Sequence, residues 1–267
     1  MSLQKEPTRI KQRGYAPVNG LNIYFEISGG GNPLVLIHGG GSTIGTTFGR
    51  IRPFLEASHR VIAVELQTHG HTADRDSPLS FTQDADDVAG VMQFLGISKA
   101  AIFGFSNGGT TAIQLAVRHP DMIDKLIIAS AFSKHTGAYP HFWEFIRDAT
   151  FADMPKELKD AFLEINSSEA DLIRMHDRDL ARMQHFTDIP DEYLQSIRAG
   201  TLILTGDRDV LTPEHAVELT RLITGARLMI LPGGHGEYIG EITTLKGGNR
   251  SYPHAAALIS NFLTTNP

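Results

Sequence analysis

The segment GFSNGG (residues 104–109) lies between an apolar run, AAIFGF at 100–105, and a helix-like run at 107–120. A serine with glycine two residues before it and two residues after it is typical of a sharp turn from a strand into a helix. Such a turn strains the serine backbone, and small neighbours avoid clashes there. We therefore predict that Ser106 stands above the carboxyl end of a strand, where open α/β sheets bind their ligands.

Composition and charge exclude several other classes of protein. The 267 residues carry a net charge of −6, with 41% hydrophobic and 20% charged residues. This mildly acidic balance, without a basic run, argues against nucleic-acid and anionic-membrane partners. The absence of cysteine excludes disulfides, thiolate nucleophiles and cysteine-based zinc sites. We find no secretory signal and no apolar stretch of membrane-spanning length, so we expect a cytoplasmic protein.

Short apolar runs alternate with longer amphipathic ones, which indicates a mostly parallel sheet with helices on both faces. Several of the apolar runs are continuous, as in strands that are buried on both faces. The expected strands are 21–27, 33–38, 60–66, 100–105, 125–130, 201–206 and 227–232, and the expected helices are 81–96, 107–120, 213–224 and 254–263.

One long segment breaks this alternation. Residues 133–198 contain no convincing strand; they are charged, helical in pattern and punctuated by prolines. We therefore predict a core formed by residues 1–132 and 199–267, with residues 133–198 inserted as a helical cap over the active site.

A serine hydroxyl needs a base to become a good nucleophile. His235 follows the last predicted strand, in the glycine-rich sequence PGGHG, which places an imidazole on a loop at the carboxyl end of that strand. The preceding strand ends in GDRD, so either Asp207 or Asp209 could orient the imidazole. We favour Asp209, because it lies further along the loop, directly before an apolar pair.

Attack by a serine creates an oxyanion that needs preorganised N–H donors. Asn107 follows the predicted nucleophile, and the strand at 33–38 leads into the sequence HGGG at 38–41. Glycine lets the backbone approach a ligand closely. We therefore expect the N–H groups of Gly40 and Asn107 to form the oxyanion hole.

These motifs together resemble the α/β-hydrolase fold family over nearly the whole chain. LVLIHGGG resembles the family's oxyanion loop, GFSNGG its nucleophile elbow, GDRD its acid turn and PGGH its histidine loop. The order Ser106, Asp209, His235 is the order found in that family. The resemblance implies a catalytic triad of these three residues and also favours Asp209 over Asp207.

The loop after the third predicted strand departs from the family pattern. The family commonly has Asp-x-x-Gly-His-Gly there, whereas this chain has Glu65 and Thr68 in place of the aspartate and the first glycine. We therefore expect His69 and His71 to shape the loop and not to catalyse. The long segment 236–253 could line the mouth of the active site or join a subunit contact.

The sequence pattern also predicts the environment of several further polar and aromatic residues. We expect Glu237 and Glu241 to be solvated, and MHDRD at 175–179 to be a solvated helix face. Phe142, Trp143 and Phe145 are spaced like one helix face, so Phe142 and Trp143 are candidates for binding substrate on the roof of an apolar pocket.

The sequence thus predicts a serine hydrolase that needs no cofactor and no metal and acts on a carboxylic ester, a lactone or a related small acyl substrate. A C–C bond hydrolase or a perhydrolase of the same fold is an alternative, since such enzymes use similar triads. A ligand receptor that has kept the triad is another. The substrate and the oligomeric state, with a homo-oligomer as one option, stay open.

Overall fold

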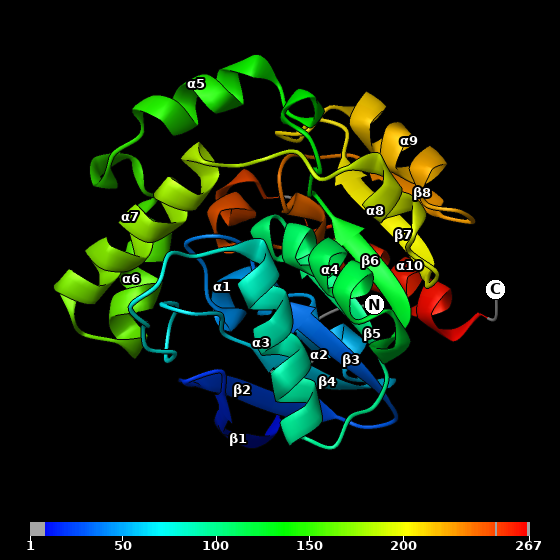
Figure 1. The fold of residues 1–267 in the computed structure, drawn as a ribbon, viewed down its shortest axis with the longest axis horizontal. Coiled ribbons are helices and arrows are strands. Elements are labelled where there is room, and N and C mark those ends of the chain that lie inside the picture. Colours follow the sequence, from blue (N-terminus) through cyan, green and yellow to red (C-terminus); the bar gives the residue numbers. More distant parts are fainter. Residues whose placement is uncertain (1–8, 249, 266–267) are drawn as a thin grey trace.

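The predicted alternation folds into one eight-stranded sheet in a computed structural model that describes residues 9–248 and 250–265. The strand order is β1-β2-β4-β3-β5-β6-β7-β8; β2 pairs antiparallel with both β1 and β4, and the other pairs are parallel (Figure 1). The strands are β1 (Ile10–Val18), β2 (Leu21–Gly29), β3 (Asn32–Ile37), β4 (His59–Val64), β5 (Ala100–Phe105), β6 (Ile123–Ala129), β7 (Gly200–Gly206) and β8 (Arg227–Leu231).

The central strands are buried on both faces because each face carries its own layer of helices. In β3, Val35 and Ile37 pack into one apolar core while Leu34 and Leu36 pack into the other, as the two-residue period of a strand requires. The first core includes residues of α3 (Phe81–Phe94), α4 (Asn107–Arg118) and α9 (Pro213–Leu222); the second includes residues of α1 (Ile44–Phe48), α2 (Arg52–Leu55) and α10 (Tyr252–Thr264).

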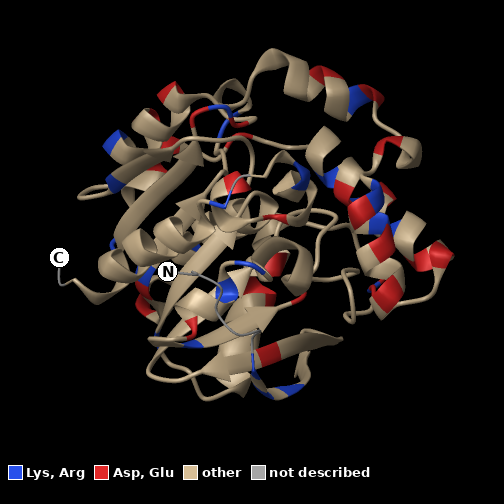
Figure 2. Cartoon of the chain, turned by 180° about the vertical axis from the view of Figure 1, so that it is seen from behind, with Lys and Arg blue, Asp and Glu red and all other residues tan. Residues whose placement is uncertain are grey.

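Between β6 and β7 the chain leaves the sheet and forms four helices. These are α5 (Pro140–Asp148), α6 (Lys156–Ile165), α7 (Glu169–Gln184) and α8 (Asp191–Gln195). Helices α5 and α6 pack on α7, whereas α8 packs on α9. Figure 2 shows acidic and basic residues interspersed along the outer turns of this helical segment, residues 133–198.

The structure adds elements that the sequence patterns did not indicate. Strand β1 lies at the edge of the sheet and most of its side chains are exposed, so its apolar pattern is weak. Pro17 is compatible with an edge strand, where a ladder donor can be missing. Helices α1 and α2 have only five and four residues, too few to show a helical period.

Candidate active site

Ser106 occupies the sharp turn between β5 and α4, with backbone angles φ 54° and ψ −124°. The residues two positions before and after Ser106 must be glycine, because a side chain at either position would clash with the backbone. A Cβ on Gly104 would lie 2.1 Å from the carbonyl oxygen of Gly108, and a Cβ on Gly108 would lie 2.2 Å from that of Ile37. A non-glycine residue rarely adopts a positive φ, and such strain clusters at functional sites. Glycine at these two positions therefore lets the turn close and lifts the hydroxyl of Ser106.

His235 lies beside this hydroxyl, on the loop that follows β8. Its Nε2 is 3.1 Å from the Oγ of Ser106, and its Nδ1 is 2.6 Å from Oδ1 of Asp209. The ring also packs against Phe105, with the ring centroids 4.8 Å apart. The structure thus brings together the three residues that the sequence places at the ends of β5, β7 and β8.

Asp209 is buried and its carboxylate is held by several donors besides His235. Burial alone would raise its pKa, but the charge and hydrogen bond of His235, with the other donors, lower the pKa to about 2. The carboxylate is therefore ionised near neutral pH and fixed in place. The additional donors are the hydroxyls of Ser130 and Thr205 and the backbone N–H groups of Gly206 and Val210.

Asp207, the other sequence candidate, does not face His235. Its side chain is 53% exposed, and its Oδ1 accepts the N–H of Gly233 at 2.7 Å. Its own N–H bonds the carbonyl oxygen of Leu231. Asp207 therefore ties the start of the histidine loop to the end of β7 instead of orienting the imidazole.

Ser130 and Tyr238 support Asp209, and sequence reasoning missed both. Because Ser130 gives its only hydroxyl hydrogen to Asp209, the Tyr238 hydroxyl, 2.6 Å away, must donate to the oxygen of Ser130. Both residues are buried. The sequence gives a hint only for Ser130, which ends an apolar run at the same sheet edge as Ser106.

The pKa of His235 reflects two opposing effects. Burial lowers it, whereas the charge and hydrogen bond of Asp209 raise it, and the net shift is upward from 6.5. The Asp209 contact places a hydrogen on Nδ1, which leaves Nε2 of the neutral ring free to accept a proton from Ser106. The ring is therefore oriented as a general base would be.

Three backbone N–H groups beside Ser106 have no hydrogen-bond partner among the described residues: those of Gly40, Asn107 and Gly108. The neighbouring groups are used, since the Ser106 N–H bonds Ala129 and the Gly41 N–H bonds Asp179. Gly40 and Asn107 lie close together, because a Cβ on Gly40 would be 2.4 Å from Nδ2 of Asn107. Asn107 is also the first residue of α4, and the first N–H groups of a helix have no acceptor within the helix.

The expectation that residues 175–179 form a solvated helix face is wrong for Asp179. This residue is 7% exposed, and Met175 is fully buried. The Asp179 carboxylate accepts hydrogen bonds from Gly41, His69 and Arg182. The pattern misled because a charged residue can be buried when it is paired, and two of the three partners, Gly41 and His69, are distant in sequence.

The comparisons with known proteins identify the family. A family model described as the alpha/beta hydrolase fold matches residues 32–167. The chain belongs to the alpha/beta hydrolase fold family. Human serine hydrolase BPHL (Homo sapiens) is 28% identical over 229 residues, which cover 81% of this chain and 77% of that protein.

Two further comparisons place the chain among related hydrolases. The pimeloyl-(acyl-carrier protein) methyl ester esterase of Vibrio atlanticus is 30% identical over 141 residues, covering 52% of each chain. The solved 2-hydroxy-6-oxo-6-phenylhexa-2,4-dienoate hydrolase of Rhodococcus sp. strain RHA1 has a TM-score of 0.76 and 20% identity, covering 98% of this chain and 100% of that one. The latter likeness establishes the fold.

Two pockets of this alpha/beta hydrolase fold protein open on Ser106 and Asn107. One of about 220 Å³ runs past Gly40 beneath α5 and α7. The other, of about 70 Å³, is bordered by His235 and Val210. Residues of the helical segment therefore contribute walls to both pockets.

The two aromatic candidates for substrate contact lie differently. Phe142 lines both pockets. Trp143 lines neither of them; its ring packs against Phe132 and Phe186, and its Nε1 donates to the carbonyl oxygen of His135 at 2.7 Å. Only Phe142 is therefore placed to touch a molecule bound at Ser106.

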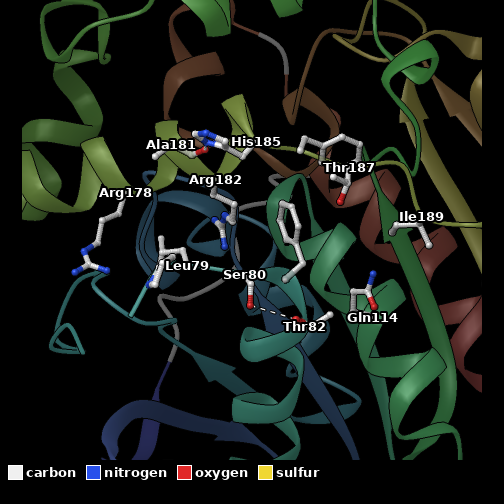
Figure 3. Close-up of a pocket in the computed structure, with 13 residues that line it drawn as sticks. Leu79, Ser80, Thr82, Gln114, Arg178, Ala181, Arg182, His185, Thr187 and Ile189 are labelled. Atoms are coloured by element: carbon white, nitrogen blue, oxygen red, sulfur yellow. Dashed lines mark hydrogen bonds between the residues drawn. The ribbon is translucent and has the colours of Figure 1, made fainter. Parts of the chain in front are cut away.

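A larger cavity of about 600 Å³ lies on the other side of α7, between that helix, α4 and the segment before α3 (Figure 3). Its described lining includes none of Ser106, Asp209 and His235. Arg182 lines this cavity, while its guanidinium bonds Asp179, which lines the pocket at Ser106. This larger cavity is thus separated from the candidate active site by the Arg182–Asp179 pair.

The segment 236–253 contacts the helical segment as well as the sheet. Lys246 forms an ion pair with Glu157 of α6. The expectation that Glu241 is solvated is wrong: it is buried and accepts the N–H of Thr243. Glu237 is half-buried and accepts the N–H of Gly234 next to His235, so both carboxylates shape this segment.

In the loop at 65–72, the side chains of His69 and His71 form hydrogen bonds that hold the loop in shape. Glu65 accepts hydrogen bonds from the backbone and the ring of His71, and His69 bonds Gln67 and Asp179.

The described residues hold no group of three or more His, Asp or Glu side chains arranged for a metal ion. None of the described helices is long and apolar enough to cross a membrane.

Proposed function

We propose that this chain is a serine hydrolase in which Ser106 is the nucleophile, His235 the general base and acid, and Asp209 the residue that orients His235. The single observation that carries the proposal is the continuous contact from Asp209 through His235 to Ser106, with distances of 2.6 and 3.1 Å. The chain is an enzyme, a hydrolase that acts on ester bonds, like relatives that are named serine hydrolase and methyl ester esterase.

The proposed reaction has two halves. Ser106 Oγ attacks the acyl carbonyl while Nε2 of His235 takes the hydroxyl proton, and the N–H groups of Gly40 and Asn107 stabilise the oxyanion. Collapse breaks the bond to the alcohol oxygen, which receives that proton from His235. A water molecule, deprotonated by His235, then attacks the acyl-enzyme; the acid leaves and the proton returns to Ser106. Each half forms one bond to the acyl carbon and breaks one.

The helical segment at 133–198 acts in this proposal as a cap. Its helices α5 and α7 supply walls of both pockets at Ser106, and the segment lies between β6, which ends at Ala129, and β7, which begins at Gly200. The cap excludes water from the acyl group and selects its shape, as concave, largely apolar sites do. The substrate in this proposal is a small acyl compound.

The fold also accommodates cleavage of a carbon–carbon bond, because the Rhodococcus structure, which shares it, is named a dienoate hydrolase. A perhydrolase and a receptor that has kept the triad are the remaining alternatives. Multiple turnover of an ester separates an enzyme from a receptor. Comparison of esters with a vinylogous 1,5-diketone at equal concentration separates ester from C–C hydrolysis.

The direct test is covalent labelling with a fluorophosphonate probe. The wild-type enzyme is expected to gain one probe at Ser106, as located by peptide mass spectrometry, and to lose its esterase activity. Ser106→Ala is expected to be unlabelled, folded and slower by a factor on the order of 10⁶. Ser196→Ala is a control, since Ser196 is exposed at the end of α8 and lines neither pocket at Ser106. Labelling that persists in Ser106→Ala would refute the proposal.

A further inference from the structure

We propose that the substrate is an uncharged ester that joins a short alcohol, of one or two carbons, to an apolar acyl chain of medium length. This inference rests on the proposed function and adds the substrate class. Three features of the site carry it: the unequal sizes of the two pockets at Ser106, the position of His235 at the smaller one, and the charges of the lining residues.

The two pockets differ about threefold in volume, at about 220 and about 70 Å³. A water molecule occupies about 30 Å³ in the liquid, so the smaller pocket holds about two atoms of that size and the larger about seven. Met154, Leu158 and Leu180 give the larger pocket apolar walls, and Ala131, Phe132 and Val210 do so in the smaller one. An ester with one short and one longer apolar arm fits this pair.

The position of His235 decides which arm is the alcohol. The general acid must lie within hydrogen-bond reach of the departing oxygen, so the alcohol begins next to Nε2 of His235. His235 borders the smaller pocket and not the larger one, whereas Gly40 borders only the larger one. With the carbonyl oxygen on Gly40 and Asn107, the leaving alcohol enters the small pocket and the acyl chain extends under α5 and α7.

The charges at the site exclude an anionic acyl chain. The described residues that line the two pockets include no lysine or arginine. They do include the carboxylates of Asp153 and Asp179 in the larger pocket. The Asp179 carboxylate is already paired with Arg182 and His69. A second carboxylate buried there would lose its hydration without gaining a cation, which is costly.

The test uses the purified enzyme and esters whose alcohols have similar intrinsic reactivity, followed by acid release in a pH-stat. The methyl, ethyl, n-butyl and n-hexyl esters of hexanoic acid report on the small pocket. The methyl esters of acetic, butanoic, hexanoic and decanoic acids report on the large one. Methyl hexanoate against monomethyl adipate, which have the same number of acyl carbons, reports on charge.

We expect kcat/KM to fall at least tenfold from methyl to n-hexyl hexanoate, because a pocket that is too short excludes added methylenes. Among the methyl esters we expect a rise from acetate to hexanoate of at least tenfold. Monomethyl adipate is expected to be at least a hundredfold poorer than methyl hexanoate.

Pocket variants make the assignment specific. Val210→Ala enlarges the small pocket and is expected to raise the n-butyl to methyl ratio about tenfold. Leu180→Trp fills the large pocket and is expected to reduce turnover of hexanoate more than of acetate. Leu163→Trp is the matched control, since Leu163 is exposed on α6 and lines neither pocket.

The outcomes separate the inference from the proposed function. Equal or faster turnover of long-alcohol esters, or of monomethyl adipate, overturns the inference while ester hydrolysis at Ser106 stands. An altered alcohol preference in Leu180→Trp with none in Val210→Ala would reverse the pockets and also overturn it. Absence of turnover on every ester together with absence of fluorophosphonate labelling refutes the proposed function, and the inference with it.

Discussion

Asp179 Oδ2 accepts the N–H of Gly41 at 2.5 Å, which joins helix α7 to the loop that carries Gly40. The same oxygen faces Nε2 of His69 at 2.9 Å, and Nδ1 of His69 faces the carbonyl oxygen of Gln67 at 2.8 Å. Since both ring nitrogens meet acceptors, His69 is a buried imidazolium. Burial lowers its pKa, but Asp179 outweighs this effect and the net shift is upward.

We predict that Asp179→Asn lowers kcat about tenfold or more on a good ester while KM changes less. Asp179 fixes the Gly40–Gly41 peptide next to the proposed oxyanion donor, and donors act in the transition state. The loss of a buried charge beside Arg182 and His69 is also expected to lower the free energy of unfolding by about 3 kcal/mol. Steady-state kinetics and urea unfolding of the variant check both effects.

The control for Asp179 is Asp177→Asn on the same helix, since the Asp177 side chain is 63% exposed. We expect this variant to keep wild-type kinetics and stability. Wild-type kcat in a folded but destabilised Asp179→Asn would show that the Gly41 contact is structural only.

The contacts of the two acid candidates predict different losses. Asp209→Asn keeps the size of the side chain but favours the wrong imidazole tautomer of His235; the equivalent change in serine proteases lowers turnover about 10⁴-fold. Asp207→Asn loses at most one hydrogen bond, to Gly233, worth about 1 kcal/mol, and is expected to stay within about tenfold of wild type. Kinetics of both variants on one ester, with circular dichroism to verify folding, give the ranking. The reverse ranking would transfer the role to Asp207.

The acidic limb of the pH–rate profile is expected to report His235. Only neutral His235 can accept the proton of Ser106, so kcat/KM falls as pH drops through the pKa of this ring. Asp209 raises that pKa above 6.5, which places the midpoint of the limb above this value. In Asp209→Asn the main cause of the upward shift is gone while burial remains, so the midpoint is expected to move to lower pH. An unchanged midpoint in that variant would mean that another group controls the limb.

The sequence was sufficient for the elements whose determinants are local. The strand before Ser106 is continuously apolar, and Gly104 is required by a contact with Gly108, only four residues away, so both features were visible as local patterns. The family match confirms the fold that these patterns predicted. The carboxyl ends of parallel strands converge, which is why Ser106 and His235 could be placed at one edge.

The remaining features depend on contacts between distant residues. Asp179 is buried with Arg182, three residues away, and with Gly41 and His69, which are more than 100 residues away in sequence. Ser130 likewise reaches Asp209 only through the pairing of neighbouring strands. A single sequence carries no signal for such pairs. A charged residue is therefore predicted to be exposed to solvent, and a hydroxyl residue is given no role.

The adjacent residues Phe142 and Trp143 of α5 are expected to respond oppositely to truncation. Phe142 lines both pockets at Ser106, so Phe142→Ala is expected to change the ratio of kcat/KM for methyl hexanoate and methyl acetate by about tenfold. Trp143 packs among Phe132, Phe186 and His135, so Trp143→Ala is expected to leave that ratio unchanged and lower the free energy of unfolding. Because the Trp143 ring is only half-buried, we expect the free energy of unfolding to fall by about 2 kcal/mol, less than the loss of about 3–5 kcal/mol when a fully buried aromatic is truncated. Ester kinetics and urea unfolding of both variants test the contrast. A selectivity change in Trp143→Ala equal to that in Phe142→Ala would mean that the aromatic cluster, and not the pocket wall alone, sets the acyl preference.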